Sequence, residues 1–473
     1  MKNIVIKEHS IKEFLLFVLL FCILLALGIY SQWPTTITPD AAMHAEIVEL
    51  IRAQGVVTTW QPYAVNQYTY PPLFHYIAFL LPLEPIDAVR ALGLVLWLLL
   101  PVAMYLLLST FDRRAAVIGA ILIGLVPSFS NVFIYSEFPQ LMSMVLLLLE
   151  WYFLRKEKHA AAAVAVGVIG LTHVFFVLVA AALFLAHVWL GGKVRALRYL
   201  GLSAVVMIPW LYAYGQIVMN VLAGTWENTR YNLTQPVFGF WSSNALYDWF
   251  VSAHGLTLVL MVLASYGLLT VKDRVLRGLF VVCVVLSVYH IPFTQLKMFD
   301  LLAVPAVMLA AIGLSAISLK SFWKKSVVVI VVIFMLMLQV NHFWVAKNWW
   351  LNPEIAPTEE FTDAARWLRS YDDTFTRVFF YQASAWGGVL SGKLPLDPDI
   401  THLEAFSDDY KEQVEGQRKI KEALVDGEGI DADIVERYDI KYFVLPVEFA
   451  GELKSDLLYS NDVWGVYRIY KKE

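Results

Sequence analysis

The sequence is short of charge and almost free of cysteine. Only 16% of its 473 residues are Asp, Glu, Lys or Arg, whereas an average soluble domain has about 25%. The low charge and the 59% of hydrophobic residues exclude a disordered chain and a basic protein that binds nucleic acid. Its two cysteines, Cys22 and Cys283, lie in apolar segments and exclude a disulfide framework. Long apolar runs are abundant instead, which is typical of a polytopic membrane protein.

The few charges are unevenly distributed along the chain. Residues 1–346 hold 21 Lys and Arg and 15 Asp and Glu, whereas residues 347–473 hold 15 and 25. The second segment is long enough to bury a core of its own. The sequence therefore predicts a transmembrane domain over 1–346, with a long outer loop at 31–87, and an acidic soluble domain over 347–473.

The apolar runs predict about eleven α-helical spans, because a spanning helix needs about 20 mostly apolar residues. The stretch from 160 to 190 fits either one kinked helix or a tight pair. The expected spans are 14–30, 88–108, 115–131, 138–154, 160–173, 175–190, 199–215, 254–271, 276–291, 298–318 and 326–345.

Lys and Arg favour one set of connecting loops, which fixes an orientation if eleven spans alternate. The alternate connections hold only four basic residues. The pattern predicts a multi-pass protein of the cell membrane with a cytoplasmic N-terminus and an extracytoplasmic C-terminal domain. The favoured set is Lys2, Lys7, Lys12, Arg113, Arg114, Arg155, Lys156, Lys158, Lys193, Arg195, Arg198, Lys272, Arg274, Arg277, Lys320, Lys324 and Lys325.

The segments predicted to lie outside carry further secondary-structure signals. Residues 38–54 fit an amphipathic helix on the membrane surface, and 70–81 fit a short interfacial or re-entrant helix. In the C-terminal domain, Thr358 is the expected N-cap of a helix that extends to Ser370. Strands are expected at 377–381, 441–445 and 463–470, so this domain is predicted to be α/β.

The first candidate for chemistry is the segment Thr38-Pro-Asp-Ala-Ala-Met-His-Ala-Glu46, directly after the first span. Asp40 and His44 are four residues apart and share a helix face. Such a pair can deprotonate an acceptor or bind a metal. The alternative is a plain helix start, with Thr38 as N-cap, Pro39 in the first position and Asp40 complementing the helix dipole.

Two further candidates lie where spans meet the outer surface. Glu137 is a carboxylate at the start of the fourth span, where it costs free energy unless it is solvated or paired; the alternative is a helix start capped by Ser136. Lys297 is the only basic residue of a short outer loop and can hold a lipid phosphate as a point charge. Its alternatives are a snorkelling lysine or a partner of Asp300.

Weaker candidates and missing motifs narrow the chemistry. His75 either faces the region of Asp40 or lies at the interface, and Arg230 lies in an outer loop rich in aromatic residues. The sequence has no Walker A loop, no dinucleotide fingerprint and no cytoplasmic loop large enough for a nucleotide-binding domain. Any chemistry is therefore expected to use an extracytoplasmic acceptor and a donor delivered through the lipid bilayer.

Together these segments resemble the GT-C superfamily of integral membrane glycosyltransferases, which use polyprenyl-phosphate-linked sugars such as dolichyl-phosphate sugars. Pro39–Val48, followed by Tyr70-Pro-Pro-Leu-Phe-His-Tyr76, is similar to the aminoarabinose and protein O-mannosyl transferases. Glu137 is similar in position to a metal-binding acid of oligosaccharyltransferase catalytic subunits. Leu296–Ala306 is similar to a run whose basic residue contacts the donor phosphate. An outer C-terminal α/β domain completes the resemblance.

The resemblance implies an inverting sugar transfer to an extracytoplasmic lipid, glycan or protein. Asp40 would be the acid/base, with Glu137 and His44 as further catalytic residues. Lys297 and Arg230 would bind the donor phosphate, and Tyr70 and His75 would line the substrate cavity. The resemblance allows an Mg or Mn ion between Asp40 and Glu137 without requiring one.

This sequence departs from the family in three places, and other functions stay open. Ala41 replaces the second acid of an Asp-Glu pair, and lysine replaces the usual arginine at 297. Ser384-Ala-Trp-Gly-Gly388 stands where an oligosaccharyltransferase has Trp-Trp-Asp-Tyr-Gly, which argues against protein N-glycosylation. The alternatives are an oligosaccharyltransferase-like enzyme that uses a lipid-linked oligosaccharide, or a non-enzymatic lipid or glycan transporter or scaffold.

Overall fold

The computed structural model describes most of the chain and divides it into two compact units. We call Met1–Pro34, Ala91–Leu211 and Arg230–Lys347 the helical unit, and Thr35–Arg90, Tyr212–Thr229 and Asn348–Glu473 the sheet unit. The two-domain boundary predicted at residues 346 and 347 stays a prediction. The described residues are 8–32, 39–55, 71–134, 136–208, 210, 258–288, 295–316, 330, 332–341, 343–344, 357–374, 376–382, 384–396, 408–428, 430–452 and 455–469.

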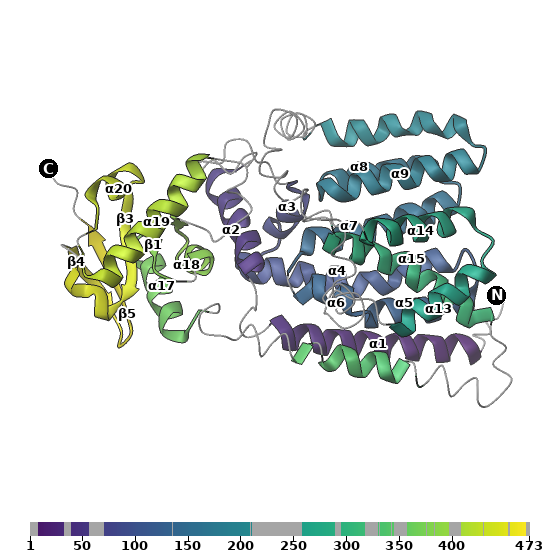
Figure 1. Cartoon of the computed structure of the whole chain (residues 1–473), viewed down its shortest axis with the longest axis horizontal. Helices are drawn as coiled ribbons and strands as arrows, with labels where there is room; N and C mark the ends of the chain where they lie inside the picture. The colour runs from purple at the N-terminus through teal and green to yellow at the C-terminus, as the bar shows by residue number, and fades with distance from the viewer. Residues whose placement is uncertain are drawn as a thin grey trace, which may run out of the picture. The chain divides into compact units, whose positions relative to one another are not determined.

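The helical unit consists of apolar helices that follow the predicted spans (Figure 1). Of the two alternatives for 160–190, the structure shows the pair: two helices, α8 and α9, separated by Leu171–His173. His173 is the N-cap of α9 and accepts a hydrogen bond from the Phe175 amide at 3.2 Å. The elements are α1 (Glu8–Gln32), α4 (Pro85–Leu108), α5 (Arg113–Leu125), α6 (Pro127–Ile134), α7 (Phe138–Arg155), α8 (His159–Gly170), α9 (Val174–Leu190), η2 (Val194–Tyr199), α13 (Leu258–Thr270), α14 (Arg274–Val288) and α15 (Gln295–Ala316).

The predicted number of eleven spans is not confirmed. Among the described residues, only α4 is a single helix long and apolar enough to cross a membrane. A second span results if α5 and α6 are counted together, and these are bent by 53°. The bend lies at Val126, whose backbone is extended, next to Pro127. The expected single helix at 115–131 is therefore two helices, because the residue before a proline disfavours the α conformation.

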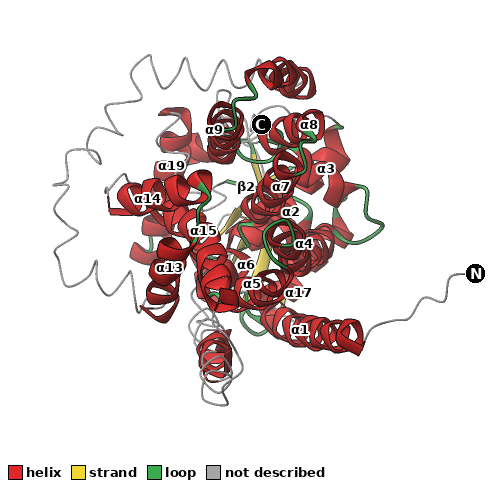
Figure 2. Cartoon of the chain, turned by 90° about the vertical axis from the view of Figure 1, so that its right-hand side faces the viewer, coloured by secondary structure: helices red, strands yellow, loops and turns green. Residues whose placement is uncertain are grey.

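Close packing of the helices forms the core of the helical unit (Figure 2). The helices α7, α8 and α9 contact one another, and α15 contacts α5, α13 and α14. The indole of Trp97 on α4 stacks on Phe133 with a ring-centroid distance of 4.5 Å. Polar pairs also join helices, such as the Ser143 and Thr172 hydroxyls at 2.6 Å. A bilayer gives little hydrophobic drive for helix association, so such packing and hydrogen bonds must hold the helices together.

The sheet unit combines two helices of the predicted outer loop with the predicted α/β domain. Its five strands are in the order β2-β1-β3-β5-β4. Strands β2, β1 and β3 are parallel, whereas β5 is antiparallel to both β3 and β4. The elements are α2 (Pro39–Gln54), α3 (Leu73–Phe79), α17 (Glu359–Tyr371), β1 (Arg377–Phe380), α18 (Ser384–Ser391), β2 (Leu394–Pro395), α19 (Asp408–Asp426), α20 (Ala432–Arg437), β3 (Ile440–Pro446), η5 (Val447–Glu452), β4 (Ser455–Ser460) and β5 (Trp464–Ile469).

The predicted α/β character of the C-terminal segment is confirmed. Thr358 is the N-cap of α17, and its hydroxyl accepts a hydrogen bond from the Phe361 amide at 3.2 Å. The three expected strands are β1, β3 and β5. Phe379, Phe443 and Leu445 are buried and belong to one hydrophobic cluster on the sheet. Two strands were not predicted: β2, which has two residues, and β4, none of whose side chains is buried.

Candidate functional site

Asp40 is the second residue of α2 and the only acid of that helix's first turn. It is half-buried. The positive end of the helix dipole favours a carboxylate at this position. The expected surface helix is not what the structure shows, because residues 41–48 are all buried. α3 and α18 both pack against α2, and its alanines allow this close approach. Asp40 thus starts a helix that is packed inside the sheet unit.

His44 and His75 form a buried pair between α2 and α3. Nδ1 of His44 lies 3.0 Å from Nε2 of His75. Burial, with a smaller contribution from His44, lowers the pKa of His75 well below its usual value. Burial thus keeps His75 in its neutral form, which can donate to or accept from His44. His44 is one helical turn after Asp40, so His75 lies against the helix that carries the candidate acid.

Glu137 lies at the sharp break between α6 and α7. Ser136 has a φ of 61°, in the left-handed region, and the helix begins at Phe138. Glu137 occupies the N-cap position, but its side chain makes no capping hydrogen bond. The helix-start alternative, with Ser136 as cap, is thus not what the structure shows. The carboxylate is half-buried and is not used to cap α7.

A buried polar contact joins the beginnings of α7 and α15. Nε2 of Gln140 donates to Oδ2 of Asp300 at 2.7 Å, and both residues are at most 2% exposed. Gln140 is three residues after Glu137, and Asp300 is three residues after Lys297. The contact therefore fastens together the two helix starts that carry these candidates. From the sequence, Asp300 was expected only as a partner of Lys297, and Gln140 carried no local signal.

Several predicted site residues lie outside what the structure describes. Tyr70 and Arg230 fall outside the described residues, and so does the side chain of Lys297, although its backbone is in the first turn of α15. Asp40 belongs to the sheet unit and Glu137 to the helical unit, so their convergence on one cavity stays a prediction. Among the described residues, no three His, Cys, Asp or Glu side chains are grouped to hold a metal.

Comparison with solved structures identifies proteins of the same architecture. The structure of ArnT from Cupriavidus metallidurans superposes with a TM-score of 0.62 at 13% identity, covering 97% of this chain and 98% of ArnT. The oligosaccharyltransferase of Archaeoglobus fulgidus gives 0.58 at 14% identity, covering 93% of this chain and 70% of that protein. Another structure of that enzyme is a complex with Zn and sulfate.

A third similar structure is the mycobacterial arabinofuranosyltransferase AftD, with a TM-score of 0.55 at 15% identity. The match covers 97% of this chain but only 42% of AftD. No protein-family model matches the sequence, and no curated protein matches it in sequence. The three structural neighbours are GT-C glycosyltransferases. The resemblance drawn from the sequence is confirmed at the level of the fold: this chain has the fold of the GT-C glycosyltransferases.

Proposed function

We propose that this chain is an integral membrane glycosyltransferase that transfers a sugar from a polyprenyl-phosphate-linked donor to an extracytoplasmic acceptor. The main support is the GT-C fold, whose match to ArnT extends over nearly the whole of both chains. A second support is Asp40, an acid in the first turn of the first helix after the first predicted span. The apolar helices of the helical unit suit a donor whose lipid tail stays in the bilayer.

The proposed reaction is a single displacement with inversion. The acceptor hydroxyl or amide loses its proton to Asp40 and attacks the anomeric carbon of the sugar. The bond from that carbon to the phosphate oxygen breaks, and polyprenyl phosphate leaves with the bonding electrons. Lys297, together with Arg230, neutralises the phosphate on which negative charge develops. Glu137 and His44 support Asp40, and Tyr70 lines the cavity. His75, which was expected to line it, is fully buried against His44 and holds that side chain in place.

A divalent cation is part of the proposal only as an option. Carboxylates and water are ligands that Mg and Mn accept, so Asp40 and Glu137 fit such an ion by their chemistry. When bound, the ion would neutralise negative charge on the phosphate. Lys297 supplies a positive charge for the same purpose without a metal.

The test is transfer of sugar from a polyprenyl-phosphate-linked donor in membranes that contain the full-length protein. Asp40→Asn should reduce transfer at least about a hundredfold, because it keeps the shape of the side chain but removes the base. Glu359→Gln is the matched control, since Glu359 is also an acid in the first turn of a helix, α17. Unchanged transfer by Asp40→Asn would remove Asp40 from the catalytic role. A lipid-linked oligosaccharide offered to the same membranes tests the oligosaccharyltransferase-like alternative.

A further inference from the structure

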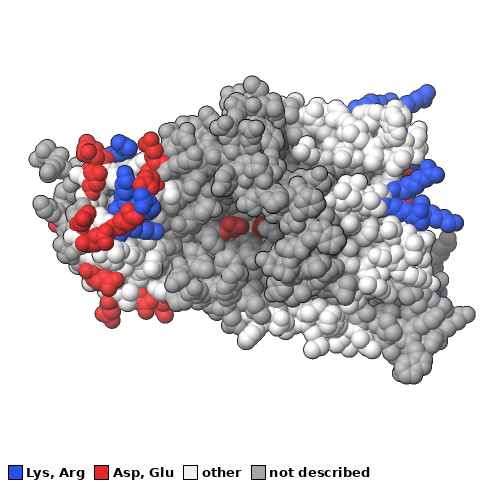
Figure 3. All heavy atoms as spheres, viewed as in Figure 1, with Lys and Arg blue, Asp and Glu red and all other residues white. Residues whose placement is uncertain are grey.

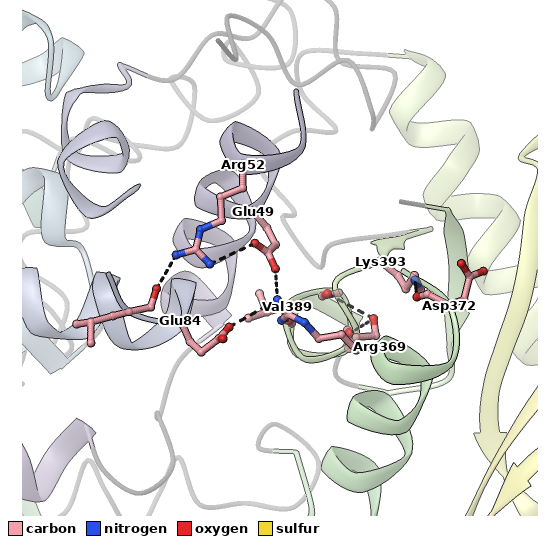
Figure 4. Close-up of polar contacts among 11 residues, drawn as sticks. Glu49, Arg52, Glu84, Arg369, Asp372, Val389 and Lys393 are labelled. Carbon is pink, nitrogen blue, oxygen red and sulfur yellow. Dashed lines mark hydrogen bonds and ion pairs between the residues drawn. The ribbon is translucent and has the colours of Figure 1, made fainter. Parts of the chain in front are cut away.

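The helix that carries Asp40 is fastened at its other end to the C-terminal part of the chain. Glu49 on α2 meets Arg369 of α17 (Figure 4), and Glu46 on α2 lies close to Gly388 of α18. We call these four residues the α2 contact. All of them belong to the sheet unit. None of them is part of the proposed chemistry, so the contact needs another explanation.

Arg369 joins three separate segments through one guanidinium group. Its Nη2 lies 2.6 Å from Oε1 of Glu49 and 3.6 Å from Oε2 of Glu84. Its Nη1 donates to the Val389 carbonyl of α18 at 3.4 Å. The Glu49 side chain is only 12% exposed. Water therefore screens its ion pair with Arg369 less than it screens a pair on the open surface.

Glu49 is also held from its own helix. Nη1 of Arg52 lies 3.8 Å from Oε2 of Glu49, and Nη2 of Arg52 donates to the Leu83 carbonyl at 2.5 Å. The Glu49 carboxylate thus lies between two guanidinium groups, one from α2 and one from α17 (Figure 4). These contacts join the last turns of α2 both to the segment before α4 and to α17.

Two glycines let α18 approach α2 and the sheet closely. A Cβ at Gly388 would lie 3.0 Å from Oε1 of Glu46 and 2.7 Å from Cδ of Pro395 in β2. A Cβ at Gly387 would overlap with the ring of Phe380 in β1. Because these distances are too short for a side chain, only glycine fits both positions. The helix α18 therefore connects the sheet to α2 with little room for movement.

From these contacts we infer that Arg369 is a positioning residue that sets the place of Asp40 through α2; this inference rests on the proposed function. Asp40 precedes Glu49 by nine residues, which is about 14 Å along a helix axis. The helix between them is buried without interruption from residue 41 to 48, so it transmits a shift as a rigid body. A shift of about 1 Å at a catalytic group can cost a hundredfold in rate.

The kinetic test compares full-length variants in the polyprenyl-phosphate sugar assay. Arg369→Ala should lower kcat about tenfold and change the donor KM less than about twofold, because the donor phosphate is bound elsewhere. Arg369→Lys, which keeps the charge, should recover at least part of the loss. Arg366→Ala is the matched control, since Arg366 lies on the same helix but is exposed. Glu49→Gln should reproduce the defect, and the double variant should be no worse than Arg369→Ala.

Amide hydrogen exchange over residues 39–54 supplies a readout that does not depend on activity. Arg369→Ala and Glu49→Gln should both speed exchange in α2, whereas Arg366→Ala should not. Faster exchange with unchanged kcat would overturn the positioning role and leave the proposed function intact. An unchanged exchange rate would overturn the α2 contact itself. If Asp40→Asn transfers sugar normally, the catalytic role of Asp40 in the proposed function fails. That outcome is independent of hydrogen exchange in Arg369→Ala, which tests only the α2 contact.

Discussion

At the scale of single residues, Asp372 is a carboxylate that its neighbours strongly stabilise in the charged form. Burial alone would raise its pKa, but hydrogen bonds from Lys441, Thr374 and Tyr442 outweigh this and hold the pKa well below its usual value. Lys441 Nζ lies 2.8 Å and Tyr442 Oη 2.6 Å from Oδ2 of Asp372. The carboxylate therefore ties the end of α17 to the start of β3.

Asp372→Asn should lower the free energy of unfolding by about 1–3 kcal/mol at pH 7, as expected for hydrogen bonds to a charged group. Because the pKa is lower in the folded protein, this stabilisation is complete above the pKa of the unfolded chain, about 4. It is lost as the pH falls further. Thermal unfolding in detergent at pH 7 and pH 3 measures the difference, with exposed Asp373→Asn as the control. Equal deficits at both pH values would contradict the prediction.

The buried histidine pair leads to a second prediction at this scale. Burial lowers the pKa of His75 in the folded protein. Just below pH 6.5, therefore, only the unfolded chain binds a proton at this histidine, and the free energy of unfolding decreases as the pH is lowered. His75→Gln should lower Tm at pH 7.5, because it disturbs the bond to His44. It should also reduce the decline of Tm between pH 7.5 and pH 5.5. His159→Gln, outside the pair, should leave that decline as in the wild type.

The sequence alone could identify individual residues only where their partners are near in the chain. The cap formed by Thr358 was predictable, because its partner is three residues away. The contacts of Gln140 with Asp300 and of Glu49 with Arg369 join residues 160 and 320 positions apart. No local pattern marks such pairs. Only the fold brings them together.

At the scale of helices and strands, apolar runs predicted where helices lie but not how they are interrupted or covered. The break at Val126 follows from the proline after it, a signal present in the sequence. The surface position expected for α2 is wrong. The spacing of its large apolar residues predicts that only one face of the helix is covered. The structure covers α2 with both α3 and α18. A helix rich in alanine does not reveal how many neighbours approach it.

Close backbone contact between α13 and α15 can be tested by a single methyl group. A Cβ at Gly267 would overlap with the carbonyl oxygen of Leu309, and the Cα of Gly267 is 3.0 Å from a Cβ built at Gly313. Gly267→Ala should therefore force the helices apart and cost about 1–3 kcal/mol. A Cβ at Gly278 of α14 meets nothing within 4 Å, so Gly278→Ala is the matched control. Thermal unfolding in detergent should show a lower Tm for the first variant only; equal Tm values would contradict the close contact.

At the scale of the whole molecule, the separation of charges that the sequence shows is also visible in space. Lys and Arg side chains gather at one end of the helical unit, whereas the sheet unit exposes both acidic and basic side chains (Figure 3). Basic residues of the helical unit make local ion pairs, such as Arg155 with Asp273 at 2.5 Å and Lys193 with Glu157 at 2.7 Å. These pairs join connections that the sequence analysis assigns to the same side of the membrane.

The orientation predicted from the basic loops can be tested by labelling single cysteines in intact cells. The background replaces Cys22 and Cys283 with serine. Lys156→Cys lies in an exposed turn after α7, and Asp433→Cys lies on the exposed surface of α20. A membrane-impermeant maleimide should label Asp433→Cys in intact cells and Lys156→Cys only after the cells are opened. Labelling of Lys156→Cys in intact cells would contradict the predicted topology. Asp40 would then lie on the cytoplasmic side, and the donor would have to be presented there.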